Sequence, residues 1–205
     1  MSCKDAIFSI LNDPRTLEIM AEAIREDHNG YLEMYDRIAA AVPAMMQHKS
    51  TIQILPMVVY GWMPTILGKS EWDDSIVELL RRKTGKFSDK EMKTILHFVN
   101  DSFIGVSKLL HFTDPEHWAI WDSNVYAAIA YVVSGEPEEM LSWFCTANYG
   151  RVDNQERFDE YQTAIREVSA ETGLPIREIE KRVFYFGRNL KKIAKKRKPA
   201  VRKHR

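Results

Sequence analysis

"GVSKLLHFTDPEHWAIWDSNVYAAI" (Gly105–Ile129) combines a glycine before a lysine, an apolar run, a loop with two tryptophans, and an aspartate before a second apolar run. We predict that one helix ends near Phe103, that Gly105–Ser107 turn the chain, and that a second helix begins near Lys108. Asp122 is expected to be the N-cap of a further helix, because its carboxylate can accept hydrogen bonds from the free N–H groups of a first helical turn. The stretch therefore favours a fold of short, capped helices.

Similar start and stop signals recur along the rest of the chain. Asp13-Pro14 is typical of a helix start, Ser88 and Glu91 have the spacing of a capping box, and Gly173 follows a long amphipathic segment. The alternation of apolar and polar residues that marks strands is scarce. We therefore predict an all-α protein of about nine or ten helices.

Proline and charge define the remaining organisation. A helix over 31–42 is expected to end before Pro43, because proline lacks the N–H that continues a helix. The more apolar segment 50–67 contains Pro56 and is expected to form a buried, kinked helix. We predict one compact multi-helix domain over 1–190 and a basic, flexible tail over 191–205.

The net charge of zero hides an asymmetry between that domain and its tail. Residues 191–205 hold nine of the 29 Lys and Arg residues and none of the 29 Asp and Glu residues, so the domain has an acidic excess of nine. Basic tails of this kind either engage phosphate backbones or remain solvated ends. The acidic domain would need its remaining cations clustered on one face to bind a nucleic acid.

Composition narrows the class of protein further. The chain is 45% apolar, and no apolar run reaches the length of a membrane-spanning helix. The N-terminus lacks the basic start and long apolar stretch of a signal peptide. Cys3 and Cys145 lie far apart and form no CxxC motif, which is typical of reduced thiols in the cytoplasm.

Familiar chemical motifs are scarce. The sequence has no glycine-rich phosphate loop, no HExxH, no Cys/His metal spacing and no Gly-x-Ser-x-Gly elbow, so we expect neither a cofactor nor a metal. His111, Asp114 and His117 form an H-x-x-D-x-x-H string. Such a string can bind a metal or can supply hydrogen bonds within a loop.

Lys108 and Asp122 each have two interpretations. Lys108 can be a solvated surface charge, or a partly buried amine that loses its proton and becomes a nucleophile. Asp122 can be a cap alone, or a carboxylate that also assists proton transfer. The predicted turn before Lys108 could also direct backbone N–H groups at a phosphate.

Four segments together resemble the helix-hairpin-helix DNA glycosylases, most closely the compact bacterial and phage proteins described as 8-oxoguanine-glycosylase-like. The segments lie between positions 60 and 188 and are "YGWMP", "GVSKLLHF", "DPEHWAIWDSNV" and "IEKRVFYFGR". One departure from the family's hairpin is Ser107, which stands where a second glycine is usual. The resemblance implies a cytoplasmic DNA-acting protein of a bacterial or phage-infected cell.

The resemblance also implies a mechanism. A modified base is flipped out of the duplex into an aromatic pocket. Lys108 would attack the sugar C1′ and form a Schiff base, Asp122 would stabilise the positive charge that develops on the sugar, and Gly105, Val106 and Ser107 would hold a DNA phosphate. The alternative is a non-catalytic factor on the same fold that binds DNA or a protein partner, for example a phage counter-defence protein.

Further candidates come from the aromatic and basic residues around these segments. Trp118 and Trp121 are either base-stacking residues or core residues, and the position beside the cap favours the core for Trp121. Of the three consecutive aromatic residues 184–186, one is expected to reach the pocket, because a helix cannot bury all three on one face. The predicted DNA-binding residues are therefore Trp62, Trp118, Trp121 and Phe186 for the base, and Arg188 and Lys191 for phosphates, together with the basic tail.

Overall fold

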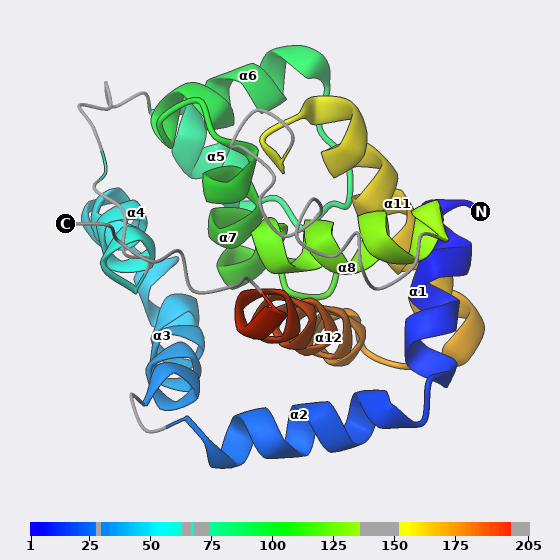
Figure 1. Cartoon of the computed structure of the whole chain (residues 1–205). Coiled ribbons are helices and arrows are strands. Elements are labelled where there is room, and N and C mark those ends of the chain that lie inside the picture. The colour runs from blue at the N-terminus through cyan, green and yellow to red at the C-terminus, as the bar shows by residue number, and fades with distance from the viewer. Residues whose placement is uncertain (28–29, 63–66, 68–73, 136–151, 198–205) are drawn as a thin grey trace, which may run out of the picture.

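The computed structural model describes residues 1–27, 30–62, 67, 74–135 and 152–197. Within these ranges the chain forms ten helices and no strand, which confirms the all-α prediction (Figure 1). None of these helices is long and apolar enough to cross a membrane. The helices are α1 (Cys3–Asn12), α2 (Arg15–Arg25), α3 (Tyr31–Met45), α4 (Lys49–Trp62), α5 (Ser75–Arg81), α6 (Asp89–Phe98), α7 (Phe103–Thr113), α8 (Ser123–Ser134), α11 (Gln155–Thr172) and α12 (Ile176–Arg197).

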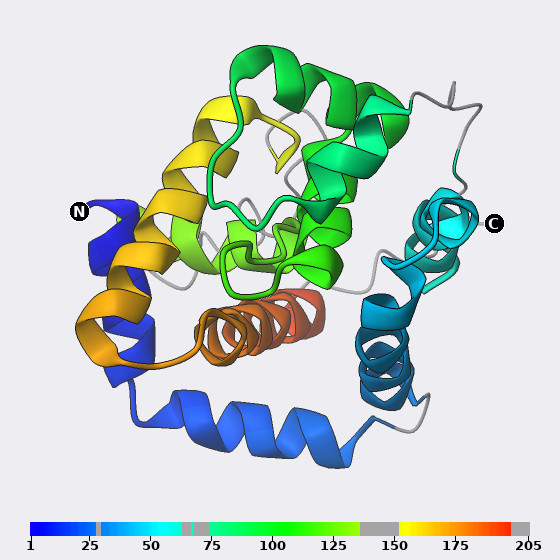
Figure 2. The ribbon, with the colours of Figure 1, turned by 180° about the vertical axis from the view of Figure 1, so that it is seen from behind.

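Helix α12 occupies a central position. It contacts α8, α2, α1 and α11, and α2 runs along the outside of the molecule from α1 towards α3 (Figures 1 and 2). Helices α5, α6 and α7 pack together; α7 contacts α3 and α4, and α5 contacts α4. One hydrophobic cluster contains buried residues of α1, α3 to α8, α11 and α12, so these helices and those around α12 share one core.

The closest helix crossing joins α8 to α12. A Cβ atom built on Gly187 would lie 2.0 Å from the carbonyl oxygen of Asn124 and 3.2 Å from the Cβ of Ala128. No side chain fits into that space, so glycine is required there. The crossing therefore fixes the start of α8, where Asp122 is the cap, against the middle of α12.

The predicted helix caps and ends were correct where the interacting side chain and backbone groups are close in the sequence. Ser88 and Glu91 form the predicted capping box at α6, Asp122 caps α8, and Gly173 ends α11 with a φ of 71°. The predicted end at Pro43 is wrong, because α3 continues to Met45 with the proline inside it. A proline this near a helix end removes one backbone hydrogen bond, and the last turn tolerates that loss.

The basic segment 191–205 begins inside a helix rather than after one. Helix α12 continues to Arg197, with Leu190 and Ala194 buried and Ile193 packed against the core. Lys192 makes an ion pair with Glu26 of α2 at 2.6 Å. Helix α12 therefore extends past residue 190, because apolar residues at helical spacing continue its buried face.

Candidate functional site

The predicted turn at Gly105–Ser107 is wrong. These residues lie in the first turns of α7, which begins at Phe103 and continues without a break to Thr113. The chain turns earlier, at Asn100 and Asp101, whose φ angles are 60° and 52°. Asn and Asp tolerate this left-handed conformation better than other side chains do, and Ser102 then caps α7.

Three of the first four N–H groups of α7 already donate hydrogen bonds. The N–H of Phe103 donates to the Asp153 carboxylate at 2.6 Å, and the N–H of Gly105 donates to the Ser102 hydroxyl at 3.3 Å. The N–H of Val106 donates to the Ser102 carbonyl at 2.9 Å. A carboxylate at this position repels an anion, so the described geometry does not provide the phosphate site expected of Gly105, Val106 and Ser107.

Packing explains these three residues instead. A Cβ on Gly105 would lie 2.4 Å from the Tyr60 hydroxyl, which donates a hydrogen bond to the Val99 carbonyl. Val106 is fully buried. The Ser107 hydroxyl accepts a hydrogen bond from the Trp121 N–H at 3.0 Å and so anchors the loop that precedes Asp122. The residues hold α7 against α4 and against that loop.

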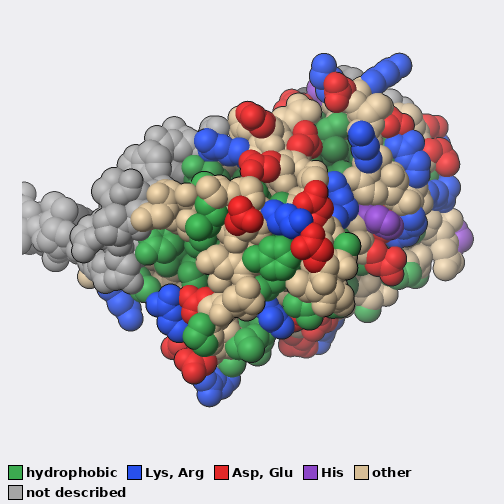
Figure 3. Space-filling view, turned by 90° about the vertical axis from the view of Figure 1, so that its right-hand side faces the viewer, with side chains coloured by type: hydrophobic (Ala, Val, Ile, Leu, Met, Phe, Trp, Pro, Cys, Tyr) green, Lys and Arg blue, Asp and Glu red, His purple; other side chains and the backbone are tan. Residues whose placement is uncertain are grey.

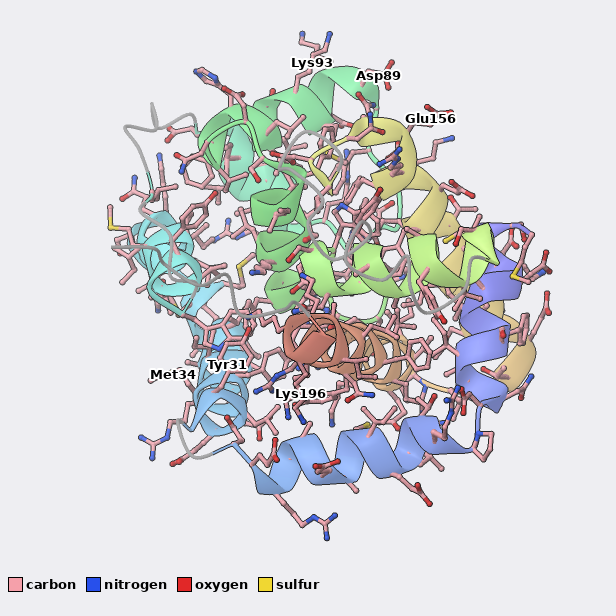
Figure 4. All side chains as sticks on the ribbon, in the orientation of Figure 1. Tyr31, Met34, Asp89, Lys93, Glu156 and Lys196 are labelled. Carbon is pink, nitrogen blue, oxygen red and sulfur yellow. The ribbon has the colours of Figure 1, made fainter. Side chains whose placement is uncertain are left out.

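Lys108 and Asp122 line the same small pocket. Lys108 comes from the middle of α7, and Asp122 is the N-cap of α8. Residues from the starts of α3 and α12 complete the walls, and Figure 4 shows Tyr31 on α3, next to α12. We call this space the Lys108 pocket; its lining is Tyr31, Leu32, Trp62, Lys108, Ile120, Asp122, Arg177, Glu180, Lys181, Phe184 and Tyr185.

The Lys108 side chain is buried, and none of the described residues forms a hydrogen bond or an ion pair with its amine. The residue is 9% exposed. The amine lies over the Trp62 ring, whose centroid is 5.5 Å from Nζ. Burial lowers the pKa of Lys108, while the negative charges of Asp122 and Glu180 oppose part of that shift. A lysine with a lowered pKa has more of the unprotonated amine that acts as a nucleophile.

Asp122 is a cap and also a wall of the pocket. Its Oδ1 accepts hydrogen bonds from the N–H groups of Asn124 at 2.8 Å and Val125 at 2.9 Å, which confirms the predicted cap. Its Oδ2 has one longer bond, from the Asn124 side-chain amide at 3.3 Å. The helix thus holds the carboxylate in one position beside the Lys108 pocket, where its charge acts on the amine.

Sequence reasoning missed the ion pair between Arg177, which is partly exposed, and the buried Glu180. Glu180 is 2% exposed and accepts a hydrogen bond from the Arg177 guanidinium. Burial raises the pKa of Glu180, and Arg177 counteracts that shift. The signal was present in the helical spacing, because Glu180 follows Ile176 by four residues and therefore lies on the buried face of α12.

Aromatic side chains close the Lys108 pocket. The rings of Tyr31 and Trp62 are stacked with centroids 4.6 Å apart, and Phe184 and Tyr185 also line the pocket. Phe186 is buried in the core instead, so its expected position in the pocket is wrong and its two predecessors take that position.

Trp118 and Trp121 are core residues and line no part of the Lys108 pocket. They are 3% and 2% exposed. The Trp118 ring N–H donates to the Thr84 carbonyl, and the Trp121 ring N–H donates to the Val152 carbonyl, both at 2.7 Å. Both side chains are thus occupied in holding the loop before Asp122, and the expected stacking on a base does not apply to them.

The two predicted phosphate-binding residues lie in different environments. Lys191 donates to the hydroxyl of Ser123, the residue after Asp122, at 2.8 Å. Arg188 lines a shallow depression between α12 and α2. The face shown in Figure 3 carries interspersed acidic and basic side chains rather than a field of one sign. Lys191 is therefore the basic residue that lies beside the start of α8 and its Asp122 cap.

The H-x-x-D-x-x-H string supplies hydrogen bonds. The Tyr35 hydroxyl lies 2.6 Å from Nε2 of His111, whose Nδ1 lies 2.7 Å from the Trp118 carbonyl. His117 pairs with Asp114 at 2.9 Å. Burial and the nearby Arg177 lower the pKa of His111 to about 3. In the described part of the chain, no group of three His, Cys, Asp or Glu residues is arranged to hold a metal ion.

The Lys108 pocket is nearly filled by its own side chains. Its cavity volume is about 20 Å³. Pockets that enclose small molecules usually have volumes of about 300–1,000 Å³. The described conformation therefore leaves no room for a nucleobase, which would enter only if side chains that line the pocket moved.

No protein-family model, curated protein or solved structure matches the chain. Residues from all four of the sequence segments quoted above line the Lys108 pocket.

Proposed function

We propose that Lys108 is a Schiff-base-forming nucleophile and that the protein excises a modified base from DNA as a glycosylase with lyase activity. The single observation that supports this most strongly is the buried Lys108 side chain, whose amine has no polar partner among the described residues and which lines one pocket with Asp122. An unpaired buried lysine costs stability, and such residues cluster at functional sites. A purely structural role would be filled better by an apolar side chain.

The chemistry follows from the two groups. The unprotonated Lys108 amine attacks C1′ of the target nucleotide, and the glycosidic bond breaks as the base leaves with its electron pair and takes up a proton. The attached nitrogen then loses a proton, the bond between C1′ and O4′ opens, and an imine forms. Asp122 stabilises the positive charge on the sugar while the base departs. The flipped nucleotide takes the space that the Tyr31 and Trp62 rings fill in the closed conformation.

Borohydride trapping tests this function directly. With duplex DNA that contains an abasic site, borohydride is expected to reduce the imine and to leave a covalent protein–DNA adduct. Lys108→Gln should abolish the adduct. Lys93→Gln is the matched control, because Lys93 is exposed on α6, away from α12 (Figure 4). The proposal fails if the wild type binds abasic DNA without forming an adduct, or if both variants trap DNA equally.

The pH dependence of trapping should move when Asp122 loses its charge. Asp122→Asn keeps a capping side chain, so α8 should still form. Its negative charge raises the pKa of Lys108, so the neutral variant should have a lower pKa there and reach half-maximal trapping at a lower pH than the wild type. The maximal rate should fall by about 10–100-fold, because the charge that stabilises the sugar is lost.

The control for this shift is Asp89→Asn, an exposed carboxylate at the start of α6 (Figure 4). Trapping rates measured across a pH series should give the same midpoint for this control as for the wild type. An unchanged midpoint in Asp122→Asn would show that Asp122 does not act on the Lys108 amine.

A non-catalytic DNA-binding function is the second candidate. Its supporting observation is the small volume of the Lys108 pocket, about 20 Å³, which leaves no room for a flipped base in the described conformation. This function predicts binding to DNA without any trapped adduct. The trapping experiment therefore separates the two candidates in a single comparison.

A further inference from the structure

A second cavity, of about 320 Å³, lies between α3, α5 and the C-terminal half of α7. We call it the α3–α7 cavity. Its volume is within the range of cavities that enclose small molecules, unlike that of the Lys108 pocket. Most of its wall is apolar, with side chains of Val42, Pro43 and Met46 from α3 and its end, Leu80 from α5 and Phe112 from α7. An apolar body of a small molecule would fit such a wall.

The polar groups in the wall have their hydrogen bonds satisfied within the protein. His111 bonds through one nitrogen to the Tyr35 hydroxyl and through the other to the Trp118 carbonyl. The Thr113 hydroxyl donates to the Leu110 carbonyl at 3.0 Å. The lowered pKa of His111 keeps its ring neutral across the physiological pH range. The inner wall therefore offers little for a polar group to bind and favours hydrocarbon.

The remaining polar lining is cationic and comes from Arg81 and Lys83. Their side chains are 38% and 61% exposed, so they lie where the cavity meets solvent. Arg81 is held in place by the carbonyls of Met46 and Gln47, and its closest carboxylate, that of Glu78, is exposed and 3.4 Å away. The Lys83 amine donates a hydrogen bond to the Thr113 carbonyl, and the carboxylate of Asp114 lies 4.0 Å away. Both cations are partly exposed, so each can also approach an anion at the mouth of the cavity.

We propose that the α3–α7 cavity binds a small amphipathic carboxylate, with its hydrocarbon body among α3, α5 and α7 and its carboxylate paired with Arg81 and Lys83. The two cations at the mouth favour a ligand with a negative charge over a neutral apolar molecule. The apolar wall, whose polar groups are hydrogen-bonded within the protein, favours a hydrocarbon body over a polar anion. The inference does not depend on the function of Lys108.

The position of the cavity links it physically to the Lys108 pocket. Tyr35 and Phe112 line the α3–α7 cavity, and their ring centroids lie 6.0 Å and 5.5 Å from that of Trp62. Trp62 lines the Lys108 pocket and covers the Lys108 amine. A carboxylate bound in the α3–α7 cavity would therefore contact the rings that support Trp62 from behind.

Isothermal titration with octanoate and with 1-octanol tests the proposal, because the two molecules share a chain length and differ in charge. Octanoate should bind one site with a Kd of about 0.1–1 mM, the range expected for a ligand of this size. Binding of 1-octanol should be at least about fivefold weaker, because it forms no charge-assisted hydrogen bonds to the two cations. No saturable octanoate binding, or equal binding of both molecules, would overturn the proposal.

Variants locate the site. Lys83→Glu should weaken octanoate binding by about tenfold and leave 1-octanol binding unchanged, because it places a like charge beside the carboxylate. Lys93→Glu, with the same change of charge on α6, should leave both unchanged. Ala39→Phe should remove binding of both molecules by filling the cavity. The thermal midpoint of each variant verifies folding, and equal octanoate affinity in Lys83→Glu and Lys93→Glu would contradict the assigned site.

Discussion

Lys108→Met is expected to raise the stability of the folded protein while it abolishes the trapped adduct. Methionine has a similar length and needs no polar partner, whereas the amine of the buried Lys108 lies over Trp62 with no polar partner among the described residues. Replacing a poorly compensated buried charge by an apolar side chain typically stabilises a protein by about 1–4 kcal/mol. We expect a gain near the lower end, about 1–2 kcal/mol, since Asp122 and Glu180 compensate part of the charge.

The gain should depend on pH in a defined direction. The pKa of Lys108 is lower in the folded state than in the unfolded chain, so between these two values the unfolded chain binds more protons. Wild-type stability from this group therefore rises with pH through that window, and the burial penalty is largest below the folded pKa. The advantage of Lys108→Met should shrink as the pH rises towards about 10, the usual pKa of lysine.

Chemical denaturation at several pH values measures this effect, with Lys93→Met as the control on the surface of α6. The control should change the free energy of unfolding by less than about 0.5 kcal/mol at every pH. A loss of stability in Lys108→Met would mean that the amine has a stabilising partner in the folded protein, contrary to the structure. A gain in stability together with a lost adduct is the combination expected of a residue kept for function.

Gly187→Ala is expected to have the largest destabilising effect, about 3 kcal/mol or more. The added Cβ would overlap the Asn124 carbonyl oxygen, and a backbone atom in a helix cannot rotate away as a side chain can. The two helices must separate, and α12 and α8 both lose buried contacts. Since Asn124 is two residues from Asp122, the change should also displace the carboxylate and reduce trapping.

Gly61→Ala is the matched control for this substitution. Gly61 also lies in a helix, and a Cβ there would meet no atom within 4 Å. Alanine is the better helix former, so this variant should be unchanged or more stable by up to about 1 kcal/mol. Denaturation midpoints of the two variants compare them directly. Equal stability of Gly187→Ala and the wild type would show that α8 and α12 are farther apart than described.

The outcome of the sequence predictions depended on how far apart the interacting residues are in the chain. The caps at Ser88 and Asp122 are interactions between a side chain and backbone groups a few residues away, so the sequence pattern alone predicted them. Gly105 was misread as a turn because its packing against Tyr60 joins residues 45 positions apart. The Asn100–Asp101 turn did have a local signal, since both residue types tolerate the left-handed conformation.

The site shows the same division. Lys108 and Asp122 were paired through the resemblance, and the structure brings them into one pocket. Arg177 and Glu180 escaped notice because charged residues on a helix are usually solvated, and only the helical spacing from Ile176 indicated burial. The choice of Phe186 over Phe184 and Tyr185 failed because the three neighbours point in different directions, and the packing partners of α12 decide which of them reaches the pocket.

The identity of the residue that carries the DNA tests the role of Lys108 most directly. After borohydride reduction with abasic-site DNA, digestion and mass spectrometry of the adduct would show which amine was modified. We predict that the modified peptide contains Lys108 and that the modification lies on its side chain. Modification of the basic segment 191–205 or of the N-terminal amine, with Lys108 unmodified, would contradict it.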